Sequence, residues 1–192
     1  MLTIYYSLFH SNLIYCLPLW SSVIQSSIKK IIVLQKSAIR ILGRTTYNAH
    51  TEPVFKKLGI LPLNDQIYFM NLQLMHQYVQ GFLPKIFNDT WITNRERRNR
   101  ILQGVDAIND QFVLRNSESL YIPFSRLSSS AKRPLINLPK LWDSFENFEI
   151  KIIRDKTEFK IKLKRFLQES FSGSIICNNL FCPSCHFPTV QA

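Results

Sequence analysis

The first 28 residues contain no Asp, Glu, Lys or Arg, and this absence constrains the fold more than any other feature of the chain. A secretory signal peptide would begin with a basic region, which is lacking here. A membrane-spanning helix needs about 20 mainly apolar residues, but this segment is interrupted by Ser7, His10, Ser11, Asn12 and Pro18. We therefore predict a buried helix that ends or kinks at Pro18, with Trp20 packed nearby, no membrane partner, and another part of a protein covering it.

The composition favours a mainly α fold with a substantial hydrophobic core. Apolar residues make up 46% of the 192 residues and aromatic residues 12%, which is too apolar for a disordered chain and enough for one domain or two small ones. The five glycines disfavour an all-β protein with many tight turns. Cys16 stands alone in an apolar segment, so we expect it in the core.

Residues 26–43 give the clearest helical pattern. At helical spacing, five apolar side chains share one face: Ile28, Ile31, Ile32, Ile39 and Leu42. Gly43 is expected to end this helix. A basic stripe on another face suits a phosphate backbone, and equally an ordinary solvated helix face: Lys29, Lys36, Arg40 and Arg44.

Two further helices are predicted before residue 87. The first lies between Thr51 as its N-cap and Gly59 as its C-terminal stop. The second begins with Asn64 or Asp65 as its N-cap, and its apolar residues recur at helical spacing: Ile67, Met70, Leu74, Met75 and Tyr78. Residues that commonly end helices close it, namely Gly81 and Pro84.

A polar run at residues 94–100 looks like a loop. Its arginines could clamp phosphate, act as a nuclear address or simply face solvent: Arg95, Arg97, Arg98 and Arg100. Residues 112–124 carry β-branched and aromatic residues around a polar turn, which is compatible with a short β-hairpin. The polar stretch that follows, 125–133, is typical of a linker.

The C-terminal part is predicted to return to helix. Residues 138–148 restart a helix, anchored by Leu141, Trp142, Phe145 and Phe148. The next segment alternates with period two like a strand, but Asp155 and Glu158 are spaced as a capping box. We predict a helix there, because apolar residues recur at helical spacing and basic residues surround them: Phe159, Leu163, Phe166 and Leu167, with Lys160, Lys162, Lys164 and Arg165.

Three cysteines and a histidine cluster near the end of the chain: Cys177, Cys182, Cys185 and His186. The two-residue gap between Cys182 and Cys185 lets both thiolates face one structural Zn²⁺. The adjacency of Cys185 and His186 makes a four-ligand set strained, so the fourth ligand could also be His50, His76, a water or another chain. A reduced solvated tail and a disulfide stay open as alternatives.

The charge favours a polyanionic partner. The chain carries 24 Lys and Arg against 13 Asp and Glu, for a net charge of +11. Residues 1–60 hold seven basic residues and one acid, and residues 115–170 hold twelve and seven, whereas residues 61–114 hold five of each. Two basic segments therefore flank a neutral middle. This balance suits nucleic acid or an anionic membrane surface as the partner, and simple solubility is the alternative explanation.

Several segments, taken in order, resemble the region that follows the fingers and palm in non-LTR (LINE-like) retrotransposon reverse transcriptases. They are "YYSLFHSNLIYCLPLW", "LQKSAIRIL", "YNAHTEPVFKKLGILPL", "YIPFSR" and "PKLWDSF", and the resemblance covers most of residues 1–170. It implies a helical thumb that grips the primer–template duplex and a downstream connection, followed in many members by a cysteine-rich element.

The chain lacks the catalytic residues that this family requires. A reverse transcriptase needs paired aspartates to hold two Mg²⁺ ions, and no Asp-Asp pair occurs here. We therefore expect a non-catalytic C-terminal piece of an RNA-directed DNA polymerase, starting from an internal Met1, whose missing palm would cover the uncharged first helix. Its location would be intracellular, in the nucleus or cytoplasm, and Mg²⁺ would belong to the intact polymerase only.

Four regions follow from these patterns: a thumb-like helical region at 1–87, a basic loop with a hairpin or linker at 88–130, helices at 131–170 and a cysteine-rich tail at 171–192. Trp91 and Trp142 are expected in the core rather than stacked on bases. The alternative function is a small protein-interaction module with a zinc-stabilised tail. An independent hydrolase is disfavoured, because no nucleophile and base lie close together in the sequence.

Overall fold

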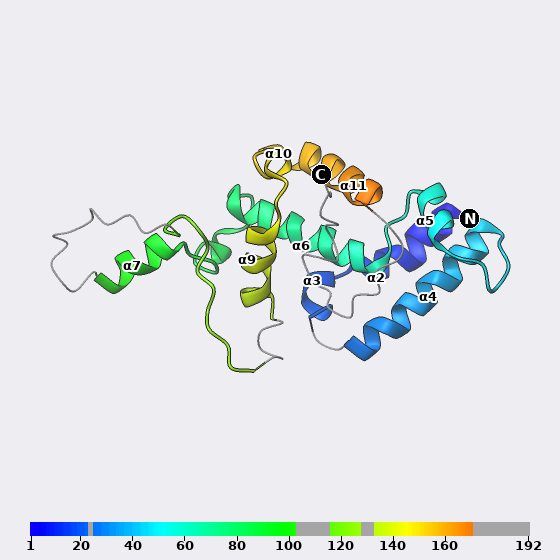
Figure 1. The fold of residues 1–192 in the computed structure, drawn as a ribbon, viewed down its shortest axis with the longest axis horizontal. Helices are drawn as coiled ribbons and strands as arrows, with labels where there is room; N and C mark the ends of the chain where they lie inside the picture. Colours follow the sequence, from blue (N-terminus) through cyan, green and yellow to red (C-terminus); the bar gives the residue numbers. More distant parts are fainter. Residues whose placement is uncertain (23–24, 103–115, 128–132, 171–192) are drawn as a thin grey trace, which may run out of the picture.

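The computed structural model describes residues 1–22, 25–102, 116–127 and 133–170. These residues are mainly helical, which confirms the mainly α part of the predicted fold class. The long helix α6, Leu63–Val79, lies in the middle of the molecule, and the ribbon in Figure 1 shows α9, α10 and α11 around one part of it and α3 to α5 around the other. Helix α7 lies at the far end, away from α4. In the described ranges, the only β-structure is one antiparallel bridge, between Thr93 and Leu120.

The uncharged N-terminal segment forms a nearly continuous helical stretch. It consists of α1 (Leu2–Ile4), the π-helical turn η1 (Tyr5–His10) and α2 (Ser11–Ile14). The stretch ends before Pro18, because Cys16 adopts a left-handed conformation with φ of 52° and Pro18 lies in the first turn of α3, Leu17–Trp20. Cys16 is exposed, so its predicted burial is wrong. Cys16 lies in the connection between α2 and α3 instead of on a packed helix face.

Helix α4, Gln25–Gly43, matches the predicted bounds and face. Ile28 and Ile39 are fully buried, and the other predicted apolar positions are partly buried against the same clusters. The left-handed C-terminal residue is Arg44, with φ of 51°, one position after the predicted stop. Gly43 has a different role: a Cβ there would lie 2.4 Å from Val54 Cγ1, so glycine lets α5 (Glu52–Leu58) approach α4 closely.

Helix α5 has the predicted ends. Thr51 is its N-cap, although its side chain makes no capping hydrogen bond, and Gly59 is left-handed with φ of 64°. The N-cap of α6 differs from the prediction, because Asn64 and Asp65 lie inside the helix. The α6 start is satisfied instead by Gln35 of α4, whose Oε1 accepts from the Leu63 N–H at 2.8 Å.

Gln35 is a buried polar link between three parts of the chain. Its Nε2 donates to the Leu61 carbonyl at 3.2 Å and to the Tyr5 hydroxyl at 3.3 Å, while its Oε1 caps α6. Each of these groups is buried, so each would be costly to leave unpaired. One side chain therefore fixes α4 against the N-terminal stretch and α6.

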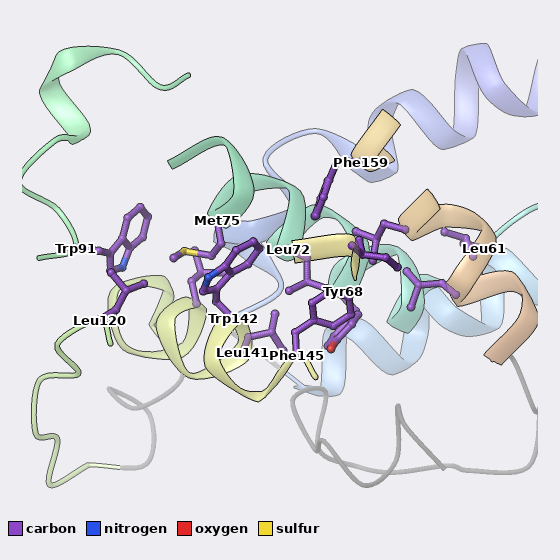
Figure 2. Close-up of a cluster of buried hydrophobic side chains, with 14 residues drawn as sticks. Leu61, Tyr68, Leu72, Met75, Trp91, Leu120, Leu141, Trp142, Phe145 and Phe159 are labelled. Atoms are coloured by element: carbon purple, nitrogen blue, oxygen red, sulfur yellow. The ribbon is translucent and has the colours of Figure 1, made fainter. Parts of the chain in front are cut away.

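The largest core surrounds α6 (Figure 2). Leu72 and Met75 of α6 pack with Trp142 of α9, with Phe145 just after that helix, and with Phe159 of α11. Trp91 and Trp142 are both buried, so their prediction as core residues is confirmed. Helix α6 is buried on more than one face, which explains why its single predicted stripe missed Tyr68, Leu72 and His76.

Trp91 is held by an unusual partner. Helix α9, Pro134–Ser144, contains Pro139, which has no N–H to donate to the Leu135 carbonyl one turn earlier. The indole N–H of Trp91 donates to that carbonyl at 3.1 Å. A proline inside a helix thus leaves a carbonyl free, and a distant segment satisfies it.

The arginine-rich segment is a helix, so its prediction as a loop is wrong. Helix α7 spans Asn94–Leu102, and the Thr93 hydroxyl accepts from the Glu96 N–H at 3.1 Å. Thr93 and Glu96 have the spacing of a capping box, a signal for a helix start that the prediction overlooked. The predicted hairpin is not confirmed: residues 112–115 lie outside the described residues, and Leu120 pairs with Thr93 instead.

The helix predicted after Asp155 is confirmed as α11, whereas α9 spans Pro134–Ser144 in place of the predicted 138–148. After α9 come α10 (Phe148–Lys151) and α11 (Lys156–Ser170). Asp155 accepts from the Glu158 N–H at 2.7 Å, and all four predicted apolar residues of α11 are buried or half-buried. Phe148 is exposed, so its predicted role as an anchor is wrong. Helix α9 ends at Ser144, and Phe148 is the first residue of the separate helix α10.

Candidate nucleic-acid interface

The basic side chains of α4, and of Arg44 directly after it, are of two kinds. Lys29, Lys36 and Arg44 are exposed, and no carboxylate of the described residues forms an ion pair with them. Lys29 and Lys36 are two turns apart and therefore share one side of the helix. These charges are free to meet phosphates.

Arg40 is different, because it holds the α4–α5 connection in place. It is half-buried, and its Nε donates to the Ala49 carbonyl at 3.0 Å. Its guanidinium carbon lies 6.0 Å from the centroid of the Tyr47 ring. Arg40 is thus a structural residue more than a phosphate contact.

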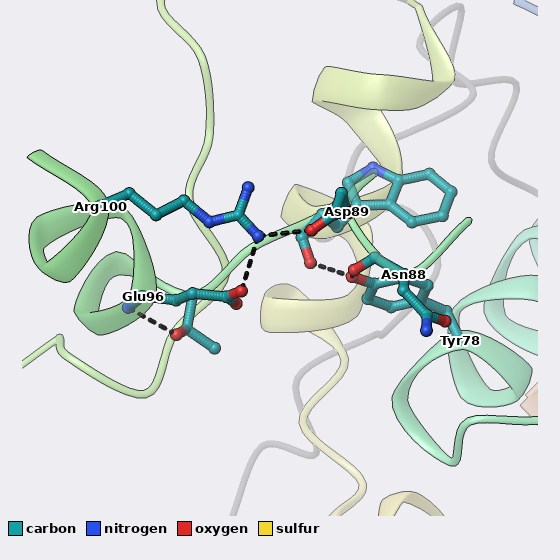
Figure 3. Close-up of polar contacts among 7 residues, drawn as sticks. Tyr78, Asn88, Asp89, Glu96 and Arg100 are labelled. Atoms are coloured by element: carbon teal, nitrogen blue, oxygen red, sulfur yellow. Dashed lines mark hydrogen bonds and ion pairs between the residues drawn. The ribbon is translucent and has the colours of Figure 1, made fainter. Parts of the chain in front are cut away.

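The arginines of α7 are engaged by neighbouring side chains. Figure 3 shows that Arg100 contacts both Asp89 and Glu96. Its Nη2 lies 2.5 Å from Asp89 Oδ1 and 2.8 Å from Glu96 Oε1. These two carboxylates raise the pKa of Arg100. Arg95 pairs with Glu118 at 3.7 Å. Both arginines therefore already have a carboxylate where a phosphate would bind.

Arg97 lies over an aromatic ring. Its guanidinium carbon is 4.0 Å from the centroid of the Tyr121 ring, a cation–π contact that joins α7 to the segment after residue 115. Arg98 is half-buried. Three of the four arginines predicted to clamp phosphate, Arg95, Arg97 and Arg100, are therefore exposed but already in contact with other side chains of this end of the molecule.

Helix α11 offers a smaller basic surface. Lys162 pairs with Glu158 at 2.7 Å, whereas Lys164 and Arg165 are exposed and Lys160 is half-buried. Burial, and then the charge of Lys164, lower the pKa of His10 in the N-terminal helical stretch. The basic residues of α11 are spread around the helix and do not form one stripe.

The prediction from the sequence missed part of the surface around α4 and α5. Lys30 and Lys57 are exposed there, and Tyr47 is exposed in the connection between the helices. Residues 25–60 contain seven basic residues and a single acid, Glu52. Lys56 is exposed as well but pairs with Glu52 at 3.8 Å. We call the other exposed cations of this unit the α4–α5 surface: Lys29, Lys30, Lys36, Arg44 and Lys57. The charge count of the segment was the signal that could have found it.

Two buried titratable groups lie outside this surface. His76 is fully buried, its Nε2 lies 2.6 Å from the Ile153 carbonyl oxygen, and its ring stacks on Phe159 at 3.8 Å. Burial lowers the pKa of His76, and burial raises the pKa of Asp65 to about 7. Since His76 is committed to the core, it is not free to be the fourth zinc ligand.

The predicted metal ligands, Cys177, Cys182, Cys185 and His186, lie outside the described residues. Within the described ranges, no group of three or more His, Cys, Asp or Glu side chains is arranged to hold a metal ion. The zinc site therefore stays a prediction from the sequence.

No helix within the described ranges combines the length and apolar character needed to cross a bilayer. Comparison of the chain with protein-family models, with curated proteins and with solved structures finds no match. The chemistry of the surface is therefore the basis for a functional proposal.

Proposed function

We propose that this chain binds nucleic acid through phosphate contacts made mainly by the α4–α5 surface. The observation that carries the proposal is the free charge of Lys29, Lys36 and Arg44, which lack an ion-pair partner among the described residues. Phosphates that replace condensed counterions on such cations supply most sequence-independent affinity. Helix α11 would add a second contact through Lys160, Lys164 and Arg165.

We propose further that the chain is the non-catalytic C-terminal part of a retrotransposon RNA-directed DNA polymerase, acting in the nucleus or cytoplasm. This rests on the resemblance of its segments to LINE-like reverse transcriptases and on the lack of an Asp-Asp pair. The exposed apolar side chains of residues 1–22 support it, because the palm of the intact enzyme would cover them: Leu2, Ile4, Leu8, Tyr15 and Leu19. Mg²⁺ and catalysis would belong to that palm.

The test is the salt dependence of binding to a labelled primer–template duplex, measured by fluorescence anisotropy. We expect log affinity to fall linearly with log salt, with a slope near −0.9 for each phosphate that the protein neutralises. Replacing Lys29, Lys36 and Arg44 with Gln should reduce that slope by about 1 for each phosphate that is no longer neutralised. Affinity that does not change between low and moderate salt would contradict the proposal.

A matched control removes the same charge elsewhere. Lys85, Arg126 and Lys140 are also exposed but belong to other parts of the molecule. Their joint replacement with Gln should leave the slope nearly unchanged. An equal loss in both triple variants would mean that net charge alone drives binding. Primer extension by this chain alone would contradict its non-catalytic role.

A second candidate, a protein-interaction module, is favoured by the same exposed apolar residues at the N-terminal stretch. Such a surface suits a protein partner as well as a palm. Protein partners that remain bound after nuclease treatment would favour this candidate over nucleic-acid binding. Loss of all partners on nuclease treatment would exclude it.

For the cysteine tail we propose a structural Zn²⁺ site that folds a nucleic-acid-gripping knuckle, with Cys177, Cys182, Cys185 and His186 as its ligands. Metal analysis should find zinc in the purified chain and less in Cys182→Ser. Absence of zinc from the parent protein would leave the reduced tail or the disulfide as the remaining interpretations.

A further inference from the structure

The turn between α4 and α5 presents an aromatic ring to solvent. The Ala49 N–H donates to the Thr46 carbonyl at 3.0 Å, which closes a four-residue turn with Tyr47 at its second position. The Tyr47 side chain is 84% exposed. In a packed protein a tyrosine ring normally buries much of its surface, so this ring is available to a ligand.

This turn is held firmly at both of its ends. Arg40 reaches from α4 to the Ala49 carbonyl, and its own carbonyl accepts from the Thr45 N–H at 3.0 Å. The close contact of Gly43 with Val54 fixes α5 against α4 near the turn. The ring is therefore presented by a braced loop, which lowers the entropy lost when a ligand binds.

Charge around the ring favours an anionic ligand. Arg40 lies beside the Tyr47 ring, and Arg44 begins the same connection. Arg44 adopts the left-handed conformation that glycine or asparagine usually occupies at a helix end, at an expected cost of about 1 kcal/mol or more. An arginine at this position places a free cation three residues before the ring.

We propose that Tyr47, with Arg44 and the braced turn, is a stacking site for an unpaired nucleotide base. The ring would stack on the base, while Arg44 binds a neighbouring phosphate. The ligand class is single-stranded nucleic acid, or the unpaired end beside a duplex. This inference rests on the proposed nucleic-acid binding, but it assigns a ligand geometry that phosphate contacts alone do not predict.

The experiment compares binding of a short labelled oligothymidylate and of a blunt duplex by anisotropy. Replacing Tyr47 with Ser should weaken oligothymidylate binding by about 5- to 150-fold, the usual effect of losing one base–aromatic stack. Tyr47→Phe keeps the ring and should bind like the parent. Blunt-duplex binding should change little in either variant.

Phe124 provides a matched aromatic control, because its ring is 86% exposed in another part of the molecule. Phe124→Ser should leave both affinities unchanged. An equal loss of affinity for Phe124→Ser and Tyr47→Ser would overturn the proposal, because a specific stacking site requires Tyr47 and not any exposed aromatic ring. Equal loss of single-strand and duplex binding in Tyr47→Ser would overturn it as well.

The Arg44→Gly variant removes the positive charge of Arg44 while keeping the fold. Glycine is the preferred residue in the left-handed conformation, so the variant should be folded as well as the parent, which circular dichroism and thermal melting can verify. Its salt slope should fall by about 1 for both ligands. An unchanged slope on the oligothymidylate would remove Arg44 from the site and overturn the proposal as stated.

The stacking site and the proposed nucleic-acid binding can fail separately. If the parent binds duplex in a salt-dependent way but Tyr47→Ser binds oligothymidylate like the parent, the stacking site is wrong and the proposed function stands. If the parent binds neither ligand, both are wrong.

Discussion

Helices α4 and α7 are both rich in Lys and Arg, yet their charges are used in opposite ways. The exposed cations of α4 have no ion-pair partner in the described parts of the chain, whereas Arg95 and Arg100 of α7 face carboxylates. The Arg97 side chain lies on a tyrosine ring. A run of basic residues therefore predicts a binding surface only where acidic neighbours are absent.

The two helices are also held differently. Helix α4 is fixed from inside by Gln35 and by buried isoleucines, while α7 is joined to its surroundings by exposed ion pairs and by backbone hydrogen bonds from the N–H groups of Asn94 and Arg95 to residues 117–119. Exposed ion pairs contribute little to stability. We therefore expect both helices to tolerate the loss of their surface charges with little change in stability.

The largest effect is expected from charge removal on the two helices in parallel. Replacing Lys29, Lys36 and Arg44 with Gln should weaken duplex binding by about 10²-fold near 0.1 M salt, from the counterions no longer released. The same replacement of Arg95, Arg97 and Arg100 should weaken it by no more than a few fold. Equal losses in anisotropy titrations would contradict the distinction between α4 and α7.

The internal attachment of α4 gives the next largest effect. Gln35→Leu removes the partner of the Leu63 N–H and of the Leu61 carbonyl. Leaving two buried backbone groups unpaired should lower the free energy of unfolding by about 2–4 kcal/mol, as measured by urea denaturation. Lys36→Leu, one position along the same helix but exposed, is the control and should change stability little.

Freeing the arginines of α7 should turn it into a binding surface. Replacing Asp89, Glu96 and Glu118 with their amides removes the carboxylates that face Arg95 and Arg100. Duplex affinity should then rise by about 5- to 10-fold at low salt, since free cations become available to phosphates. No increase would mean that the position of α7, and not its neutralisation, keeps it from binding.

The smallest effect is expected for the pH dependence of stability, through His76 of the central helix α6. Burial lowers the pKa of His76 in the folded state, so its neutral form is favoured there. The associated stability is present above the unfolded pKa of about 6.5 and is lost as the pH falls toward the folded value. The nearby Asp155 opposes the shift. Thermal melting should show a decline below about pH 6.5 that His76→Gln reduces; an identical decline in both proteins would remove His76 as its cause.

Much of the fold follows from local patterns in the sequence. The bounds of α4, the ends of α5 and the buried face of α11 come from helical spacing and from capping residues. The α7 helix could also have been predicted, because Thr93 and Glu96 stand at capping-box spacing. These features depend on residues within a few positions of each other.

The features that could not be predicted join residues far apart in the chain. Gln35 caps a helix 28 positions later, and Arg95 is neutralised by a glutamate beyond residue 115. For the candidate site, the basic stripe of α4 was visible, but the structural role of Arg40 depends on the turn that follows it. Spacing along the sequence does not encode such partners.

The hydrogen bond from the Trp91 indole to the carbonyl left free by Pro139 affects how the chain behaves when it is cut. It joins two points of the chain that are 44 positions apart. A protease that cuts between these points should therefore produce two fragments that stay associated and migrate as one species until denatured. The same cut in a Trp91→Phe variant, which keeps an aromatic ring but loses the N–H, should let the two fragments separate more readily.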